Sequence, residues 1–405
     1  MAEFPMVLIL AGLAAYAVLG GADFGAGLWE LAARGPGGAD VREHTHRAMA
    51  PVWEANHVWL VLVLVVCWTA YPTAFASIAS TLTIPLFIAG FGIILRGTSY
   101  ALRSGRPTDR EEGALSVVLA LSSILTPFAL GASVGAVASG RVPVGNAGGD
   151  PWSSWLNPTS LLIGTLAVVS AAYVAAVYLA GDAKRGELSE LAGSFRKRAL
   201  VSGALVGAIA VTGPLVLHQD ARPLFDGLSS GPGLVAGLVS GVSGVLTLAL
   251  VYRERFEPAR LSAAIAIGAI VAGWGLAQEP SFLPGLTVKE AAAGDSTLVA
   301  MAISIGVGML ILVPSLALLF RLQLSGRFDP GDGVAAVERS ESPGERSATQ
   351  LAAAAVTVAI GTVGAFLGKG WLLGAGVAAM LAGATLAFLV LATPEDESAG
   401  DAAET

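Results

Sequence analysis

A short stretch, Trp53–Leu60, concentrates side chains that could do acid–base chemistry. It holds the carboxylate of Glu54, the amide of Asn56 and the imidazole of His57, and an apolar run follows at once. Glu54 and His57 are three residues apart, so on a helix they are neighbours and could relay a proton. The same residues allow other interpretations, because Glu54 and Asn56 could satisfy free backbone donors of a first helical turn and His57 could bind a haem.

A second group of polar residues lies in the first apolar segment of the chain. Gly20, Asp23, Gly27 and Glu30 recur at helical spacing and share one face. The glycines would let a neighbouring helix approach closely. Asp23 and Glu30 are about 10.5 Å apart along a helix axis, which suits two steps of a proton path. Asp23 could instead be a structural partner of Arg96, and Glu30 an ordinary carboxylate at a membrane interface.

The composition is that of an integral membrane protein. Of the 405 residues, 54% are hydrophobic and only 13% are charged, whereas a soluble domain carries about 25% charge. The net charge of −7 comes partly from an acidic C-terminal tail, so the chain shows no patch for nucleic acid. The single cysteine, Cys67, excludes an intrachain disulfide. The first apolar run is too long for a cleaved signal peptide and should remain as a membrane helix.

We expect eleven apolar segments that cross the membrane, since a span needs about 20 mainly apolar residues. They are residues 5–32, 52–71, 74–100, 114–139, 158–180, 199–218, 232–252, 260–278, 297–320, 351–368 and 371–392. Arg and Lys gather in the loops after the odd-numbered segments, which predicts an N-terminus outside and a C-terminus in the cytoplasm. The polar residues of the first three segments then lie toward the cytoplasmic side. His44 and His46 fall in the first inner loop, where we expect them to be solvated.

The chain divides into four parts by composition. Residues 1–325 form a nine-helix membrane domain, and residues 326–350 are a polar cytoplasmic linker rich in acidic residues, Gly and Pro. Residues 351–392 form an additional transmembrane hairpin, and residues 393–405 an acidic cytoplasmic tail. The fold class is therefore all-α and membrane-spanning.

Three stretches resemble subunit II of the cytochrome bd-type quinol oxidases. Gly20–Gly27, with the sequence GGADFGAG, resembles the G-x-D-x-G-x-G element of that family. Ala50–Leu60, with the sequence APVWEANHVWL, is similar to the family's A-P-x-W-[DE]-[GA]-N-x-V-W-L signature. Leu95–Tyr100, LRGTSY, resembles its arginine-bearing helix end. The resemblance covers roughly residues 1–325.

The resemblance implies a fold of two four-helix bundles plus a ninth helix. It also implies a partner, subunit I, which carries haems b and d and the quinol site, in a complex that oxidises quinol and reduces dioxygen to water. The present chain would hold no haem and no metal, would stabilise subunit I and would supply part of a cytoplasmic proton path. Such complexes lie in bacterial plasma membranes. Whether a quinone is also bound structurally stays open.

Site residues follow from the matched motifs. The resemblance makes Asp23 and Glu54 candidates for the proton path, Trp53 and Asn56 residues that shape it, and Arg96 a structural or electrostatic residue. Where this chain has His57 the family often has Gln or Glu, which weakens a relay role for His57. Glu54 replaces the commoner Asp.

Two features leave alternatives open. The hairpin 351–392 departs from the family pattern, and it could either stand in for a small accessory subunit or dock on the lipid side. Buried carboxylates beside Arg96, together with glycine-interrupted helices, would also suit a proton-coupled secondary transporter.

Overall fold

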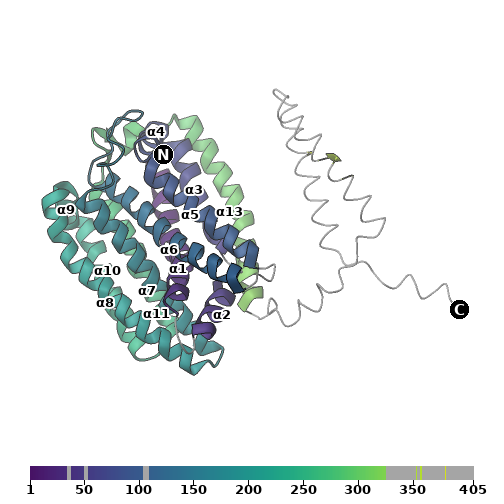
Figure 1. Cartoon of the computed structure of the whole chain (residues 1–405). Coiled ribbons are helices and arrows are strands. Elements are labelled where there is room, and N and C mark those ends of the chain that lie inside the picture. The colour runs from purple at the N-terminus through teal and green to yellow at the C-terminus, as the bar shows by residue number, and fades with distance from the viewer. Residues whose placement is uncertain are drawn as a thin grey trace. The chain divides into compact units, whose positions relative to one another are not determined.

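The computed structural model describes residues 1–33, 38–49, 53–103 and 109–324, and four positions beyond residue 350. The chain forms two compact units, Met1–Gly308 and Met309–Thr405. Apart from those four positions, the predicted linker, C-terminal hairpin and tail lie outside the described residues. Figure 1 shows the described part as a set of long helices.

Eight helices are long and apolar enough to cross a membrane, within the described residues. They are α1 (Phe4–Ala32), α5 (Thr83–Arg103), α6 (Asp109–Ala138), α7 (Pro158–Arg185), α8 (Ser189–Asp220), α10 (Gly231–Tyr252), α11 (Phe256–Gln278) and α13 (Asp295–Leu324). A further helix, α3 (Trp53–Ala70), contributes the shorter apolar stretch Asn56–Ala70. The chain is therefore an all-α, multi-pass membrane protein, as predicted. Its division into two four-helix bundles stays a prediction.

The third predicted segment, 74–100, is two helices rather than one. The first is α4 (Pro72–Thr81), and α5 begins at Thr83 after a turn at Leu82. Pro85 explains the break, because proline has no N–H to offer and its ring clashes with the carbonyl four residues earlier, here Thr81. The hydroxyl of Thr83 donates to the Ala79 carbonyl at 2.8 Å and so satisfies an acceptor near the break.

A helix replaces most of the first predicted inner loop. This helix, α2 (Gly38–Met49), is polar, but Val41, Thr45 and Ala48 recur at helical spacing on one side. Val41 and Thr45 are buried, and Ala48 packs partly against the same core as Val41. The solvated loop predicted for this segment is therefore wrong, because a short amphipathic face was enough to dock it.

The connections between the long helices carry the remaining elements. They contain α9 (Arg222–Leu228), α12 (Val288–Ala291) and a two-stranded antiparallel hairpin. The hairpin joins β1 (Ser281–Leu283) to β2 (Leu286–Thr287), with Ser281 opposite Thr287. Gly285 supports its tight turn with a φ of 75°.

Helix α1 is central to the first unit and packs against α3, α6, α7 and α11 (Figure 1). Its closest approach is to α7, where a Cβ built on Gly25 would lie 1.9 Å from the Ala171 carbonyl oxygen. The indole N–H of Trp29 also donates to the Ala172 carbonyl at 2.8 Å. The small residues of α1 thus do what their spacing predicts, because they let α7 approach the backbone.

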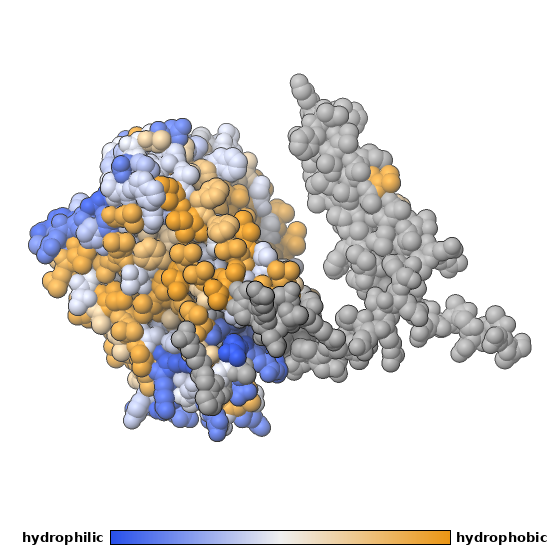
Figure 2. All heavy atoms as spheres, viewed as in Figure 1, coloured by the Kyte–Doolittle hydropathy of each residue, from blue (hydrophilic) through white to orange (hydrophobic). Residues whose placement is uncertain are grey.

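The surface fits a membrane environment. Hydrophobic residues cover the middle of the surface seen in Figure 2, and hydrophilic residues gather toward its ends. Large apolar side chains on different helices are widely exposed, among them Phe87 at 76% and Val211 at 79%. A soluble protein rarely exposes so much contiguous apolar surface, whereas lipid accepts it.

Candidate functional site

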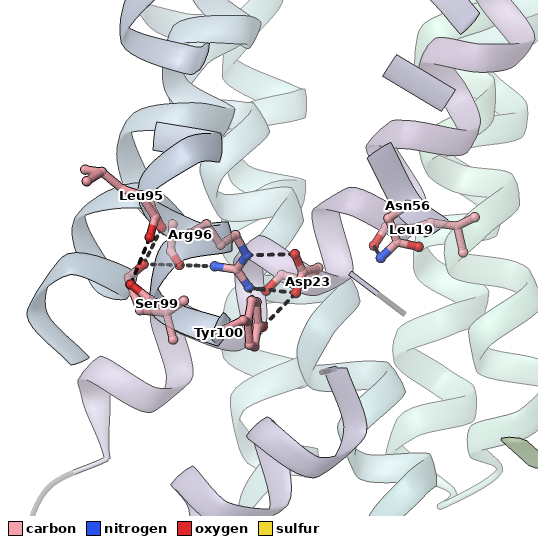
Figure 3. A network of polar contacts seen from close by, with 10 residues as sticks. Leu19, Asp23, Asn56, Leu95, Arg96, Ser99 and Tyr100 are labelled. Carbon is pink, nitrogen blue, oxygen red and sulfur yellow. Dashed lines mark hydrogen bonds and ion pairs between the residues drawn. The ribbon is translucent and has the colours of Figure 1, made fainter. Parts of the chain in front are cut away.

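A buried ion pair between α1 and α5 forms the centre of the candidate site. Arg96 donates from Nε to Asp23 Oδ2 and from Nη2 to Asp23 Oδ1, both at 2.7 Å (Figure 3). Both residues are 0% exposed. Two parallel bonds between a guanidinium and a carboxylate fix geometry as well as charge. Asp23 and Arg96 are therefore partners, which is the contact that the structural interpretation of Asp23 predicted.

Two further side chains complete the hydrogen bonding. The hydroxyl of Tyr100, one turn beyond Arg96, donates to Asp23 Oδ1 at 3.0 Å. Arg96 Nη1 donates to Ser123 Oγ on α6 at 2.9 Å, and Ser123 donates in turn to the Leu119 carbonyl at 2.7 Å. The network thus ties α1, α5 and α6 together.

Aromatic and glycine residues shape the space around the guanidinium. Arg96 Cζ lies 5.0 Å from the centre of the Phe24 ring and 5.3 Å from that of Tyr100. These are cation–π distances, which partly compensate for the lost hydration of the charge. A Cβ on Gly27 would lie 2.1 Å from Ser123 Oγ and 3.1 Å from Arg96 Nη1. Gly27 therefore leaves the room that this network occupies.

Glu30 lies near the same network. It is buried, at 5% exposed, and its charge acts on both Arg96 and Tyr100. Its position relative to a membrane interface, the other interpretation of Glu30, stays a prediction. Asp23 and Glu30 are therefore two buried acids close to one guanidinium.

His57 and Asn56 approach α1 from α3. Asn56 Nδ2 donates to the Leu19 carbonyl at 3.1 Å, so Asn56 joins the two helices. The His57 ring makes edge contacts with Tyr16 and Phe24, at centroid distances of 5.9 and 6.2 Å. Two aromatic rings of α1 therefore pack beside the imidazole.

The other predicted residues divide into those the structure places and those it does not. Gly20 is placed, since a Cβ on it would lie 2.8 Å from the Tyr16 ring, and it therefore makes room for that ring. Trp53 and Glu54 belong to the first turn of α3, but their side chains lie outside the described residues. The relay between Glu54 and His57 stays a prediction.

The two histidines of α2 are part of the packed structure. His44 makes a 3.3 Å hydrogen bond with the Leu179 carbonyl and contacts the Phe195 ring at 5.9 Å. Burial lowers the pKa of His44. The hydrogen bond with the Leu179 carbonyl acts in the opposite direction and raises the pKa, but burial is the larger effect. His46 stacks on Tyr100, with ring centres 5.7 Å apart and an angle of 26°. The expectation that both are solvated is wrong, because α2 lies against the helices that carry the site.

Three residues of the site were not predicted from the sequence. Tyr100 could have been found, since it lies four residues after Arg96 and so shares its helical face. Tyr16 likewise stands seven residues before Asp23. Ser123 has no such signal, because it comes from a distant helix and serine is common in membrane helices. Within the described ranges, no three His, Cys, Asp or Glu side chains gather as a metal site would require.

Comparisons with known proteins agree on one family. The sequence profile described as "Cytochrome bd terminal oxidase subunit II" matches residues 1–323. A curated protein of Bacillus subtilis (strain 168), named "Putative cytochrome bd menaquinol oxidase subunit II", is 24% identical over 313 residues, which cover 74% of this chain and 88% of that protein. A chain from "The structure of bd oxidase from Geobacillus thermodenitrificans" is similar with a TM-score of 0.63 and 24% identity. That match covers 80% of this chain and 98% of the other.

Proposed function

Because the chain belongs to the family of cytochrome bd terminal oxidase subunit II, we propose that it supplies part of the path by which protons reach the site of dioxygen reduction. As a subunit of a cytochrome bd quinol oxidase it works beside subunit I. Reduction of dioxygen to water consumes protons, and a membrane enzyme must conduct them through an apolar interior. This membership favours the oxidase over the proton-coupled transporter.

One observation supports the proposal above others, namely the buried network of Asp23, Arg96 and Tyr100 with Glu30 close by. Ionisable groups inside a membrane protein are costly and usually functional. Glu30 lies nearer the C-terminal end of α1 than Asp23 does, so the two acids would form successive steps of the path. A proton reaching Asp23 neutralises the carboxylate and leaves Arg96 uncompensated. In this proposal Asp23 then passes the proton on.

The proposed path has a direction relative to the membrane. The distribution of Arg and Lys places the N-terminus outside, so the end of α1 that carries Glu30 faces the cytoplasm. His57 contacts Tyr16 and Phe24, so it lies deeper along α1 than Glu30 does. Protons would thus be drawn from the cytoplasm, and their consumption would build a gradient across a bacterial plasma membrane.

The haems b and d belong, in this proposal, to subunit I. The packing of Tyr16 and Phe24 against His57 supports a haem-free role for the present chain. A structurally bound quinone is compatible with the proposal. The nine-helix domain 1–325 would carry the contacts with subunit I, and the hairpin 351–392 would either replace an accessory subunit or dock on the lipid side.

The test uses the purified two-subunit complex and a soluble quinol. Asp23→Asn and Glu30→Gln should slow oxygen consumption while the haem content of the complex stays unchanged. Asp226→Asn is the control, because this carboxylate lies on α9, is exposed and pairs only with Arg222 in the described part of the chain. Loss of haem from the Asp23 variant would assign the residue to assembly of the complex and contradict the path.

A further inference from the structure

The hydroxyl of Tyr16 stands out among the buried polar groups around the proposed path. Tyr16 is 7% exposed, and its hydroxyl has no hydrogen-bond partner among the described residues. Its ring belongs to an apolar cluster with Phe24 and Ala171, packed against residues such as Trp59 and Leu130. A buried hydroxyl without a partner is unfavourable. Buried water commonly satisfies such groups.

Geometry directs this hydroxyl toward the ion pair. A Cβ on Gly20 would lie 2.8 Å from Cε2 of Tyr16 and 3.3 Å from Cζ. The ring thus folds over Gly20, along α1 and in the direction of Asp23. The charges of Asp23 and Arg96 both act on the hydroxyl, which agrees with this direction.

The two neighbours of Tyr16 offer suitable hydrogen-bonding groups. An ionised carboxylate has about four acceptor positions. Three positions of the Asp23 carboxylate are taken by Arg96 Nε, Arg96 Nη2 and the Tyr100 hydroxyl, which leaves one on the Oδ2 side. On the other side of Tyr16, the His57 ring lies at a centroid distance of 5.9 Å. The Tyr16 ring therefore packs against an imidazole of α3, and its hydroxyl lies within electrostatic range of an acid of α1.

We propose that the Tyr16 hydroxyl, with a bound water, connects the α1 part of the proton path to His57. The proposal rests on the proton path proposed above. A proton on Asp23 moves through the water to the Tyr16 oxygen, while the tyrosine O–H proton moves to the imidazole. Asp23 returns to its ionised form beside Arg96, His57 becomes an imidazolium, and Tyr16 remains neutral. Rotation of the O–H bond then resets the hydroxyl, and no oxidant or reductant is required.

Gly20 gains a specific role in this proposal. Any side chain there would push the Tyr16 ring away from the position it occupies over α1. Gly20 is thus a positioning residue, because it sets where the hydroxyl lies without contacting a proton itself.

The experiment compares Tyr16→Phe with Tyr71→Phe in the purified complex. Tyr71 is also buried, but its hydroxyl donates to the Ala2 carbonyl, away from the path. Tyr16→Phe keeps the ring and should lower kcat for oxygen consumption by up to about a hundredfold, the low end for a positioned proton-transfer group. The KM for quinol and the haem spectrum should stay unchanged, and the solvent deuterium isotope effect on kcat should rise. Tyr71→Phe should change none of these.

The outcomes separate this inference from the proton path itself. Normal turnover in Tyr16→Phe, with slow turnover in Asp23→Asn and Glu30→Gln, would overturn the role of Tyr16 alone. Normal turnover in all three variants would overturn the path and the inference together. If Tyr16→Phe does not assemble, Gly20→Ala moves the hydroxyl without removing it. Slow turnover with normal haem content in that variant would support the proposal, and unchanged turnover would contradict it.

Discussion

The Asp23–Arg96 pair is the residue-scale feature on which the site depends. Both groups lose their hydration entirely, so their attraction is offset by a large desolvation cost. The pair gains from additional partners, since Tyr100 donates to Asp23 and accepts from Arg96, and Ser123 accepts from Arg96. A pair of this kind contributes little net stability when intact but is strongly destabilising when broken.

This asymmetry gives a prediction for single and double variants. Arg96→Leu should lower the free energy of unfolding by about 3–5 kcal/mol, because Asp23 is left buried and unpaired. Adding Asp23→Leu should recover part of that loss, since no uncompensated charge remains. The exposed pair Arg47–Glu43, whose side chains are 59% and 69% exposed, is the control and should cost no more than about 1 kcal/mol. Thermal unfolding of the complex measures all three, and a double variant less stable than Arg96→Leu would contradict the coupling.

At the scale of elements, α1 holds the site because neighbouring helices approach it closely. Gly25 contacts the backbone of α7, and a backbone carbonyl cannot rotate away as a side chain can. Gly25→Ala should therefore destabilise the protein by about 1–3 kcal/mol, the usual cost of overpacking. Gly90→Ala on α5 is the matched control, because nothing lies within 4 Å of the added methyl group. Equal stability of the two variants in thermal unfolding would argue against the close α1–α7 contact.

Helix α2 should dock in a pH-dependent way. Burial lowers the folded-state pKa of His44 below its usual value of 6.5, against raising contributions from the Leu179 carbonyl and Asp182 and a lowering one from Arg47. The unfolded segment thus binds a proton more readily than the docked one. Docking is fully stable above about pH 6.5 and weakens as the pH falls through the folded-state pKa. Hydrogen exchange of α2 should accelerate on acidification, and His44→Gln should remove that dependence. If hydrogen exchange of α2 in the wild-type protein did not change with pH, this prediction would be contradicted.

The limits of the sequence are clearest at α2 and at the start of α5. Pro85 predicts the α4–α5 break once its clash with the fourth preceding carbonyl is considered. The docked side of α2 could also have been read from Val41, Thr45 and Ala48. The stacking of His46 on Tyr100 could not, because it depends on how α2 lies across distant helices. Asp23 and Arg96 were found because charged residues are rare in membrane segments, whereas Ser123 is recognisable only when α6 is placed beside α5.

At the scale of the whole molecule, the chain is one subunit of a cytochrome bd quinol oxidase. Purified from its native membrane with its partner, it should show haem absorption bands. After removal of the partner, the isolated chain should show none, because the proposed function assigns the haems to subunit I. A Soret band that stayed with the isolated chain, and vanished in His57→Gln, would instead identify His57 as a haem ligand. Absence of haem even with the partner present would contradict an oxidase of this family, since the complex would then have no haem to carry electrons from quinol to dioxygen.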